Sequence, residues 1–342
     1  MKALLVRLSS IGDVVHTLPA LAALHRHGWD AGWVVEPASR ILLDNNPLLT
    51  QVIGVPAAKA FGWQAALGAL RTARSGRYHV ALDFQGLWKS AAWARLSGAR
   101  RVVGYARPWR REPSSALLLR ERVARPQGTA HVIDKNLALL RPLGIEAVGL
   151  RDFPLPFSAE AVARVDRAVA HVGGGGVAVL NPGGGWSSKL WPAERFGELA
   201  KGLRARGLHP LVTWGPGEEA LADQVVASSA GAAVRSLPTT LLDFIELARR
   251  ARLVVGADTG PLHLACAVGA PVVGLFGPTD PARNGPFAAG DVVVRRVPSC
   301  APCYRRGCLH HAGVMQQIQV AEVLAAAEGR VAAAGEHDWR AV

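Results

Sequence analysis

Residues 2–27 read KALLVRLSSIGDVVHTLPALAALHRH, and the pattern in this stretch decides the fold. Lys2–Leu8 is a short apolar run, which suits a strand buried on both faces of a parallel sheet. A polar turn follows at Ser9–Asp13. Val14–His27 then carries apolar residues at helical spacing, and Gly28 closes the helix. The chain is therefore expected to open with a strand, a turn and a helix.

Strand and helix patterns alternate along the rest of the chain. Further strands are expected over Trp33–Val35, Tyr78–Phe84, Val177–Asn181, Pro210–Trp214, Leu253–Ala257 and Val272–Phe276. Helices are expected over Leu87–Leu96, Ala193–Arg206, Leu241–Arg250, Leu262–Val268 and residues 316–328. This alternation predicts an α/β fold of doubly wound domains with parallel sheets.

A run of glycines marks the expected boundary between two such domains. Residues 171–176 read HVGGGG, which is typical of a flexible linker or a turn, and the alternation starts again after it. We therefore expect two facing Rossmann-like domains with an inter-domain cleft. Ligands of open α/β sheets bind beyond the carboxyl ends of the strands, so the site is expected in that cleft.

The composition indicates a folded protein with room for two cores. The chain has 342 residues, of which 50% are hydrophobic and 19% charged, as in globular domains. The formal net charge is +13, and residues 95–125 hold nine arginines against Glu112 and Glu121. This stretch is either a solvated surface or attracts an anionic partner. No nucleic-acid-binding motif is present, so the favoured partner is a membrane surface or an acidic substrate, and nucleic acid is not expected.

The sequence also predicts where the protein works. Arg7 interrupts the apolar opening, which ends in a polar turn, so this opening does not resemble a signal peptide. The uncharged stretch 259–279 contains His263 and Pro271 and reads as a strand and a helix of a core, not as a membrane span. Four cysteines in so long a chain do not indicate a secreted disulfide scaffold. We expect a cytoplasmic protein that associates peripherally with the cytoplasmic face of the inner membrane.

The turn after the first strand holds the first candidate for chemistry. Gly12 permits an unusual backbone there, and Asp13 stands at the carboxyl end of the strand, where catalytic groups collect. Asp13 either caps the following helix or acts as a general base toward an acceptor hydroxyl. The spacing leaves both readings open.

The second candidate is the loop NPGGGWSSKLWP at residues 181–192. A glycine loop after a strand lets backbone amides approach phosphate oxygens. Ser187, Ser188 and Lys189 add hydroxyl donors and a positive charge. The spacing matches neither the Walker A motif nor the dinucleotide-binding fingerprint. The alternative is an ordinary glycine turn with a surface lysine.

The third candidate is the segment GADTGPLH, which ends at His263. Asp258 ends a strand, and Pro261 suits the first position of a helix. The amides of Thr259 and Gly260 would then point out of a helix N-terminus, which suits a diphosphate. The alternative is a well-capped helix with a buried histidine.

A fourth loop, at residues 214–219, also follows a strand. Its Glu218 either accepts hydrogen bonds from ribose hydroxyls or lies in a solvated turn.

Four segments, taken in order, resemble glycosyltransferase family nine, the ADP-heptose:lipopolysaccharide heptosyltransferases. They are SSIGDVVHTLPA at 9–20, DFQGLWKS at 83–90, KLWP at 189–192 and DTGPLH at 258–263. The resemblance covers nearly the whole chain and is closest to the heptosyltransferase I members. It implies a GT-B fold and an inverting transfer of heptose from ADP-heptose to the Kdo-lipid A inner core of lipopolysaccharide.

The resemblance also implies roles for single residues. Asp13 would be the general base, and Lys189 would bind the diphosphate or stabilise it as it leaves. The donor would be bound by Ser187, Ser188, Glu218, Asp258, Thr259, Gly260, Pro261, Leu262 and His263. The acceptor would be bound by Ser10, Gly12, His16, Gln85 and Lys89. No cofactor and no metal are implied, and the chain contains no Asp-x-Asp pair of the kind that holds a divalent metal at a nucleotide diphosphate.

The domains and partners follow from the same resemblance. Residues 1–170 would bind the acceptor, residues 171–315 would bind the nucleotide sugar, and residues 316–342 would form a helix and tail that pack back on the first domain. The partners would be an ADP-sugar donor and an anionic lipid-linked sugar acceptor, met at the cytoplasmic face of the inner membrane.

One segment departs from heptosyltransferase I. Cys300, Cys303 and Cys308 are followed by His310, and these ligand types and spacings suit either zinc or, as we favour, reduced thiols that pack a loop. Other readings of the whole chain are a transferase for another sugar nucleotide or a later core acceptor, a sugar-nucleotide epimerase, and a non-catalytic nucleotide-sugar-binding protein.

Overall fold

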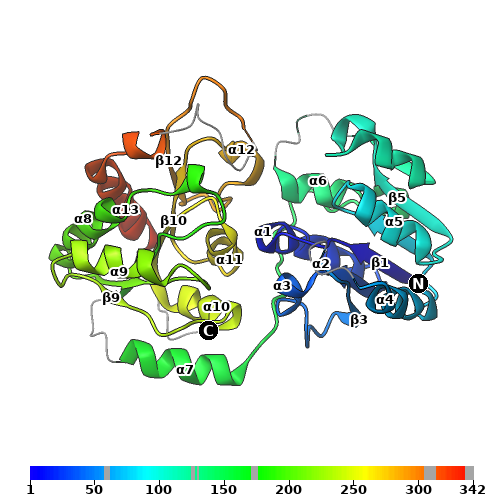
Figure 1. The fold of residues 1–342 in the computed structure, drawn as a ribbon, viewed down its shortest axis with the longest axis horizontal. Coiled ribbons are helices and arrows are strands. Elements are labelled where there is room, and N and C mark those ends of the chain that lie inside the picture. Colours follow the sequence, from blue (N-terminus) through cyan, green and yellow to red (C-terminus); the bar gives the residue numbers. More distant parts are fainter. Residues whose placement is uncertain (58–61, 125–127, 129–130, 171–175, 304–312, 336–342) are drawn as a thin grey trace. The chain divides into compact units, whose positions relative to one another are not determined.

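The computed structural model describes residues 1–57, 62–124, 128, 131–170, 176–303 and 313–335. The chain divides into two compact units, Met1–Phe157 and Ser158–Val342. Each unit contains a parallel sheet with helices packed against it (Figure 1). The predicted α/β fold of two Rossmann-like units is therefore confirmed.

In the first unit, the described residues form a six-stranded parallel sheet of order β3-β2-β1-β4-β5-β6. Its strands are β1 (Lys2–Val6), β2 (Asp30–Val35), β3 (Leu49–Gly54), β4 (Val80–Asp83), β5 (Arg101–Tyr105) and β6 (Glu121–Val123). Its helices are α1 (Ile11–Val15), α2 (Leu18–Arg26), α3 (Pro37–Arg40), α4 (Trp63–Ser75), α5 (Trp88–Leu96) and α6 (Val132–Ala138), with the 3₁₀-helices η2 (Arg107–Trp109), η3 (Pro113–Leu118) and η4 (Arg141–Leu143).

In the second unit, the described residues form another six-stranded parallel sheet, of order β12-β11-β10-β7-β8-β9. Its strands are β7 (Val177–Asn181), β8 (His209–Val212), β9 (Val234–Arg235), β10 (Ala251–Ala257), β11 (Val272–Phe276) and β12 (Val292–Arg295). Its helices are α7 (Ala159–Ala170), α8 (Ala193–Ala205), α9 (Glu219–Ser228), α10 (Leu241–Arg250), α11 (Gly260–Ala267), α12 (Pro281–Asn284) and α13 (Val320–Ala334), with the 3₁₀-helices η5 (Ser187–Lys189) and η7 (Met315–Gln317).

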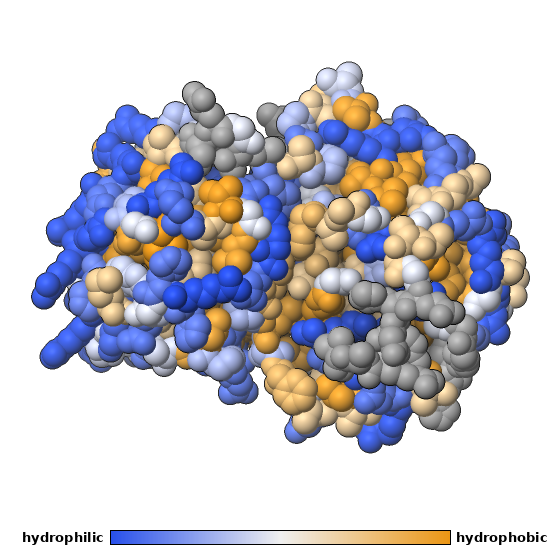
Figure 2. All heavy atoms as spheres, turned by 180° about the vertical axis from the view of Figure 1, so that it is seen from behind, coloured by the Kyte–Doolittle hydropathy of each residue, from blue (hydrophilic) through white to orange (hydrophobic). Residues whose placement is uncertain are grey.

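The central strands are buried on both faces, as their apolar sequences predict. In β1, residues 3–6 are fully buried, and Leu5 pairs in register with Trp33 on one side and Leu82 on the other. Helices on both sides of a parallel sheet exclude water from both faces of each strand, which favours such continuous apolar runs. On the face of the molecule drawn in Figure 2, by contrast, hydrophobic and hydrophilic side chains lie side by side.

The helix predicted over Val14–His27 is in fact two helices. The first is α1, and α2 begins only at Leu18, after His16 and Thr17. Pro19 lies in the first turn of α2, where its missing N–H removes no helical hydrogen bond. The break leaves Asp13 on a short helix at the end of β1.

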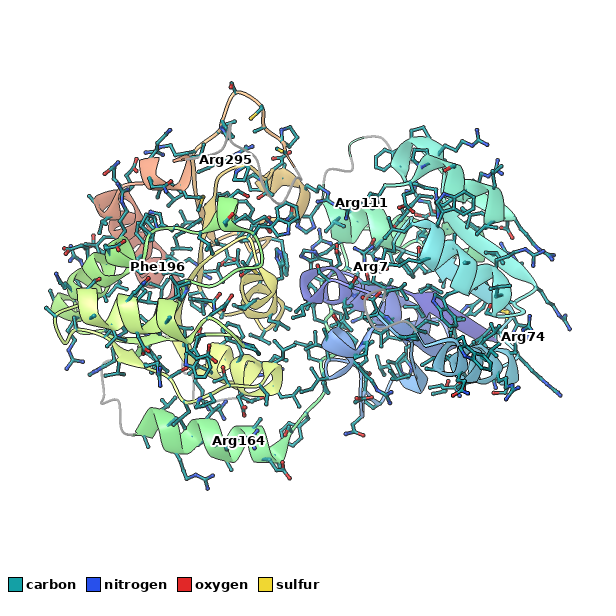
Figure 3. All side chains as sticks on the ribbon, viewed as in Figure 1. Arg7, Arg74, Arg111, Arg164, Phe196 and Arg295 are labelled. Atoms are coloured by element: carbon teal, nitrogen blue, oxygen red, sulfur yellow. The ribbon has the colours of Figure 1, made fainter. Side chains whose placement is uncertain are left out.

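The boundary between the units lies before α7, whereas the glycine run predicts it after residue 170. Helix α7 packs against α10 of the second unit. Arg164 of α7, labelled in Figure 3, donates to Asp243 Oδ1 at 2.7 Å, and Asp166 accepts from Arg250 Nε at 2.7 Å. These ion pairs, which join residues far apart in the sequence, attach the helix to the second unit.

The C-terminal helix belongs to the core of the second unit. Helix α13 packs against α8 and the strands β10, β11 and β12 of that unit. Its buried residues Val323 and Ala327 belong to the same core cluster as Trp191 and Phe196. The sequence-based expectation that the C-terminal helix and tail also pack on the first domain stays a prediction. Within the described ranges, no helix is long and apolar enough to cross a membrane.

Candidate active site

Each sheet has one point at which the order of its strands reverses. In the first unit this point lies between β1 and β4, and in the second it lies between β7 and β10. The segments that follow β1 and β4 carry Asp13 and Gln85, and those that follow β7 and β10 carry Lys189 and Asp258. Sheets of this kind bind ligands at the carboxyl ends of the strands on either side of such a point. The topology therefore gathers the predicted site residues at one such point in each unit.

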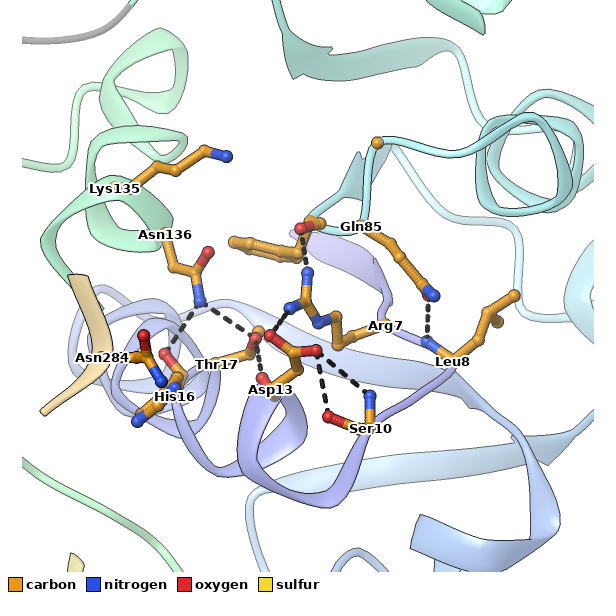
Figure 4. Close-up of polar contacts among 12 residues, drawn as sticks. Arg7, Leu8, Ser10, Asp13, His16, Thr17, Gln85, Lys135, Asn136 and Asn284 are labelled. Atoms are coloured by element: carbon orange, nitrogen blue, oxygen red, sulfur yellow. Dashed lines mark hydrogen bonds and ion pairs between the residues drawn. The ribbon is translucent and has the colours of Figure 1, made fainter. Parts of the chain in front are cut away.

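Asp13 lies in α1 and is held by three groups (Figure 4). Ser10 donates to Asp13 Oδ2 from its backbone N–H at 3.3 Å and from its hydroxyl at 3.1 Å. The guanidinium of the buried Arg7 forms an ion pair with Asp13 Oδ1 and also donates to the carbonyl of Phe84. The side chain of Asp13 remains 34% exposed, so a ligand can reach a carboxylate whose orientation is fixed. Ser10 and Asp13 thus form the expected cap, and this geometry does not prevent action as a base.

A second network supports the turn after α1. Asn136 of α6 donates to the carbonyl of His16 at 2.9 Å and to the hydroxyl of Thr17 at 3.1 Å. The hydroxyl of Tyr105 donates to Asn136 Oδ1 at 2.7 Å, and burial raises the pKa of Tyr105 well above its usual range. His16 is buried with its ring edge-on to that of His131. The predicted acceptor residue His16 therefore also has a packing role.

The other predicted acceptor residues lie just after β4, in α5 and in α1. Gln85 Oε1 accepts from the backbone N–H of Leu8 at 2.8 Å, which joins the loops after β1 and β4. Lys89 forms an ion pair with Glu36 at 2.6 Å. Gly12 is buried in α1 and carries no side-chain donor.

Lys189 lies at the end of η5, in the loop after β7. Its Nζ is 2.6 Å from Asp258 Oδ2 and 3.0 Å from the carbonyl of Asp258, and it lies 4.6 Å from the centre of the Trp186 ring. An ammonium has three N–H donors, and two are used by Asp258. No acceptor among the described residues takes the third, so it can bind an anionic ligand at the carboxyl end of the sheet.

Asp258 is the centre of a buried polar cluster. Its Oδ1 lies 3.2 Å from His263 Nε2 and accepts from Asn284 Nδ2 at 2.5 Å. Burial by itself raises the pKa of Asp258, but the hydrogen bonds and charges of His263 and Lys189 outweigh it and hold that pKa well below its usual range. Asp258 is therefore ionised at neutral pH, and protein donors occupy both of its oxygens.

The remaining predicted donor residues surround this cluster. Thr259 is the N-cap of α11, and its hydroxyl donates to the carbonyl of Ala257 at 3.2 Å. Gly260 and Pro261 form the first turn of α11. Pro261 has no N–H, so the N-terminal amides at this end of the helix are those of Thr259, Gly260 and Leu262. Leu262 is buried in the core, and Ser187 is exposed. The hydroxyl of Ser188 is buried and has no hydrogen-bond partner among the described residues.

Glu218 does not belong to this cluster. Its Oε1 accepts from the N–H of Gly184, and its Oε2 accepts from the N–H of Gly215, both at 2.9 Å. A Cβ on Gly183 would lie only 2.0 Å from Glu218 Oε2. Glu218 therefore clamps the two glycine loops, a role that the sequence-based reading as a ribose ligand does not anticipate.

The cysteine segment lies partly outside the described residues. Cys300 is exposed and Cys303 is half-buried, while Cys308 and His310 fall in the segment 304–312, which the structure does not describe. Among described side chains, no group of three or more His, Cys, Asp and Glu residues is arranged to hold a metal ion.

The structure adds two site residues that sequence reasoning missed. Arg7 carried a usable signal, because a buried charge at the end of an apolar strand requires a partner, and the partner is Asp13. Asn284 carried no such signal, because it lies 26 positions beyond Asp258 on another short helix. Only the folding of the chain brings Asn284 into contact with Asp258.

Comparison with known proteins identifies relatives of the chain. A family model described as glycosyltransferase family 9 (heptosyltransferase) matches residues 68–312. Lipopolysaccharide heptosyltransferase 1 of Pseudomonas aeruginosa is 33% identical over 91% of this chain and 88% of its own length. The protein of the same name from Escherichia coli K12 is 30% identical over 86% of this chain and 93% of its own length.

Solved structures agree with the fold. A glycosyl transferase of family 9 from Veillonella parvula superposes with a TM-score of 0.79 at 19% identity, covering 97% of both chains. The E. coli heptosyltransferase WaaC superposes with a TM-score of 0.76 at 24% identity, covering 96% of this chain and all of its own.

Proposed function

The chain belongs to glycosyltransferase family 9, the heptosyltransferases, and from this premise we propose that it moves heptose from ADP-heptose to the Kdo-lipid A inner core of lipopolysaccharide. The relatives named heptosyltransferase 1 support this substrate pair. The observation that carries the chemistry is the Lys189–Asp258 pair, which holds a cation at the carboxyl end of the second sheet, where an anionic leaving group is bound in this fold class.

The proposed reaction is a single displacement with inversion. The carboxylate of Asp13 accepts the proton of the acceptor hydroxyl as the hydroxyl oxygen attacks the anomeric carbon of the heptose. The bond from that carbon to the diphosphate oxygen breaks, and ADP leaves with the bonding electrons. The ammonium of Lys189 and the first amides of α11 stabilise the charge that develops on the diphosphate.

The contacts of the two carboxylates support a division of roles. Asp13 is partly exposed, so it is the carboxylate that can meet an acceptor. Asp258 is buried and fully engaged, so its proposed role is to position Lys189 beside the donor. Thr259, Gly260, Pro261 and Ser187 are proposed to line the donor site, with Ser188 contributing the hydroxyl that has no partner among described residues. Ser10, Gly12, His16, Gln85 and Lys89 are proposed to line the acceptor site.

We further propose that the reaction needs no metal and takes place at the cytoplasmic face of the inner membrane. Lys189 and the N-terminus of α11 supply the positive charge that a divalent cation supplies in other transferases. The lipid part of the acceptor accounts for the membrane location.

The test is transfer from ADP-heptose to Kdo-lipid A by the purified full chain in the presence of EDTA. We expect transfer by the unchanged protein, a product with the opposite anomeric configuration to the donor, and a loss of about 10²-fold or more in Asp13→Asn. Asp30→Asn, an exposed aspartate at the start of β2, is the matched control and should keep full activity.

Three results would count against the proposal. Absence of transfer would indicate that the donor is another sugar nucleotide or that the acceptor is a later core sugar. Loss of activity in EDTA that returns with a divalent cation would remove the metal-free mechanism. Full activity of Asp13→Asn would remove the assignment of the base.

A further inference from the structure

One side of the first unit exposes apolar side chains. Helices α4 and α5 and the 3₁₀-helix η3 cover one face of the first sheet, where Ala69, Ala73, Ala94 and Ala116 pack in its core. We call the outward side of these three elements the α4–α5 face. The exposed fractions of its large apolar residues are well above those of core residues: Trp63 64%, Leu67 42%, Trp88 43%, Leu96 48% and Leu117 62%.

The same side of the unit is almost without exposed negative charge. Between residues 45 and 111 the sequence contains a single carboxylate, Asp83. That carboxylate is completely buried against Arg110 and does not reach the surface. Arg71 and Arg74 of α4 and Arg95 of α5 are exposed. The surface therefore carries cations and large apolar groups together.

The charged residues next to the α4–α5 face leave its net charge positive. Lys89, at the start of α5, is paired with Glu36. Glu112 is the next carboxylate along the chain, and its Oε2 accepts from the backbone N–H of Trp88 at 2.5 Å. The arginines Arg71 and Arg95 have no acidic partner among the described residues.

The apolar groups are also oriented with respect to the site. In a parallel sheet the helices run back against the strands, so their N-termini lie at the carboxyl ends of the strands. Trp63 begins α4 and Trp88 begins α5, which places both indoles at the edge of the sheet that carries Asp13 and Gln85. At the other end, Arg74 Nε donates to the carbonyl of Leu96 at 3.0 Å, and Figure 3 shows Arg74 at the periphery of this unit.

We propose that the α4–α5 face docks on the surface of a bilayer that contains anionic phospholipid. Tryptophan prefers the interface between lipid and water, Leu67 and Leu117 add buried apolar area, and the arginines attract anionic headgroups. The inference rests on the proposed function, because a docked face with its tryptophans at the carboxyl edge would hold Asp13 close to an acceptor whose lipid stays in the membrane.

The test is co-sedimentation of the full chain with vesicles of phosphatidylcholine, with and without phosphatidylglycerol. We expect binding to the vesicles that contain phosphatidylglycerol, and weaker binding as salt is added. Trp63→Ala combined with Leu67→Ser should lower the partition coefficient by roughly tenfold or more. Arg71→Glu should lower it about fivefold or more.

The controls carry equal changes elsewhere on the surface. Leu237→Ser and Val297→Ser alter apolar residues of the second unit that are 58% and 61% exposed. Arg26→Glu makes the same change of charge at the exposed end of α2. All three should bind vesicles like the unchanged protein. Transfer to a water-soluble acceptor without lipid A should proceed at the same rate in the face variants and in the unchanged protein.

The outcomes separate this inference from the proposed function. Equal vesicle binding by face and control variants, or no binding by the unchanged protein, would overturn it. Self-association that depends on Trp63 and Leu67, without vesicle binding, would also overturn it and assign the face to a second copy of the chain. Failure of transfer to the soluble acceptor by the unchanged protein would instead reject the function and leave a positive vesicle result in place.

Discussion

Nζ of Lys189 lies 2.6 Å from Oδ2 of Asp258, although the two residues are separated by 69 positions in the sequence. They meet because β7 and β10 are neighbours in the sheet and the loops after both strands emerge at the same edge. The pair fixes one end of a flexible side chain. A lysine held in this way can stabilise a charge without reorganising during the reaction.

The first prediction concerns this lysine. Lys189→Met should lower kcat by about 10²–10³-fold, because the group that meets the leaving diphosphate is lost. The measurement is steady-state transfer with saturating acceptor. Lys201→Met, which removes an exposed lysine paired with Glu198 on α8, is the matched control and should be active. Equal effects of the two changes would contradict the role given to Lys189.

The sequence places Lys189 and Asp258 just after two strands, and there is a physical reason why the fold then brings them together. A strand followed by glycines and a lysine, and a strand followed by Asp, Thr, Gly and Pro, are local patterns, and parallel strands bring their ends to one edge. Lys189 meets Asp258 because β7 and β10 are neighbours in the sheet. The order of the strands cannot be read from the local sequence. Residues on other elements, such as Asn284, have no local pattern and appear only once the chain is folded.

The differences between the predicted and observed bounds of a helix and of the units have the same origin. The helical spacing of apolar residues in Val14–His27 continues through Thr17. It therefore gives no sign of the break between α1 and α2, where Thr17 is the N-cap of α2 and Pro19 lies in its first turn. The glycine run at 171–176 is a real local signal, but α7 before it is attached to the second unit by the ion pair of Arg164 with Asp243. Such long-range contacts override local composition.

The second prediction concerns Asn284 as a positioning residue. Asn284→Leu keeps a similar size but removes the N–H that Asp258 Oδ1 accepts, leaving His263 as the donor to that oxygen. A lost hydrogen bond to a charged group is worth about 1.5–3 kcal/mol, so kcat should fall by roughly 10–100-fold.

Comparison with Asn284→Asp separates positioning from packing. This variant keeps the shape but places a second carboxylate against Asp258, and it should be at least as impaired as Asn284→Leu. Its activity should recover partly at acidic pH, where one of the two carboxyl groups binds a proton. Near-normal kcat in both variants would show that His263 and Lys189 orient Asp258 without help.

The third prediction concerns the clamp made by Glu218. Gly183→Ala would place a methyl group 2.0 Å from Glu218 Oε2, so the carboxylate must leave the N–H groups of Gly184 and Gly215. We expect a lower melting temperature and a higher KM for the donor. Gly185→Ala is the matched control in the same loop, because a Cβ there meets no atom within 4 Å.

A second change identifies the cause of this effect. Adding Glu218→Ala to Gly183→Ala removes the group that clashes, so the double variant should be no less stable than Glu218→Ala alone. If the stability loss of the double variant instead equals the sum of the losses of the two single variants, the methyl group disturbs another contact.

The fourth prediction compares two ion pairs of the first unit. Arg110 and Asp83 are both completely buried and lie 2.6 Å apart, and Arg110 also donates to the hydroxyl of Ser115. Arg110→Met leaves a buried carboxylate without its charge partner and should cost about 3–5 kcal/mol of stability. Arg40→Met breaks the exposed pair with Asp44 and should cost about 1 kcal/mol or less. Chemical denaturation followed by circular dichroism measures both, and similar losses would be inconsistent with the burial of the first pair.

The last prediction is a dependence of stability on alkaline pH. Tyr78 is buried against Gly32 and Gly76, where an added Cβ would lie 2.0 Å and 2.9 Å from its hydroxyl, and burial raises its pKa from 10.0 to about 12. The folded state therefore favours the neutral phenol, as does its hydrogen bond to Gln51. The stability from this group is fully present below pH 10 and is lost as pH rises toward 12, because the unfolded chain releases the proton first.

Tyr78→Phe removes the titrating group and leaves the ring. It should lower stability slightly at neutral pH, through loss of the hydrogen bond to Gln51, but flatten the decline between pH 10 and 12. The measurement is the melting temperature of both proteins across this range. If the two curves fall in parallel, another group causes the alkaline loss, and Tyr105, whose buried phenol also has a raised pKa, is the next to change.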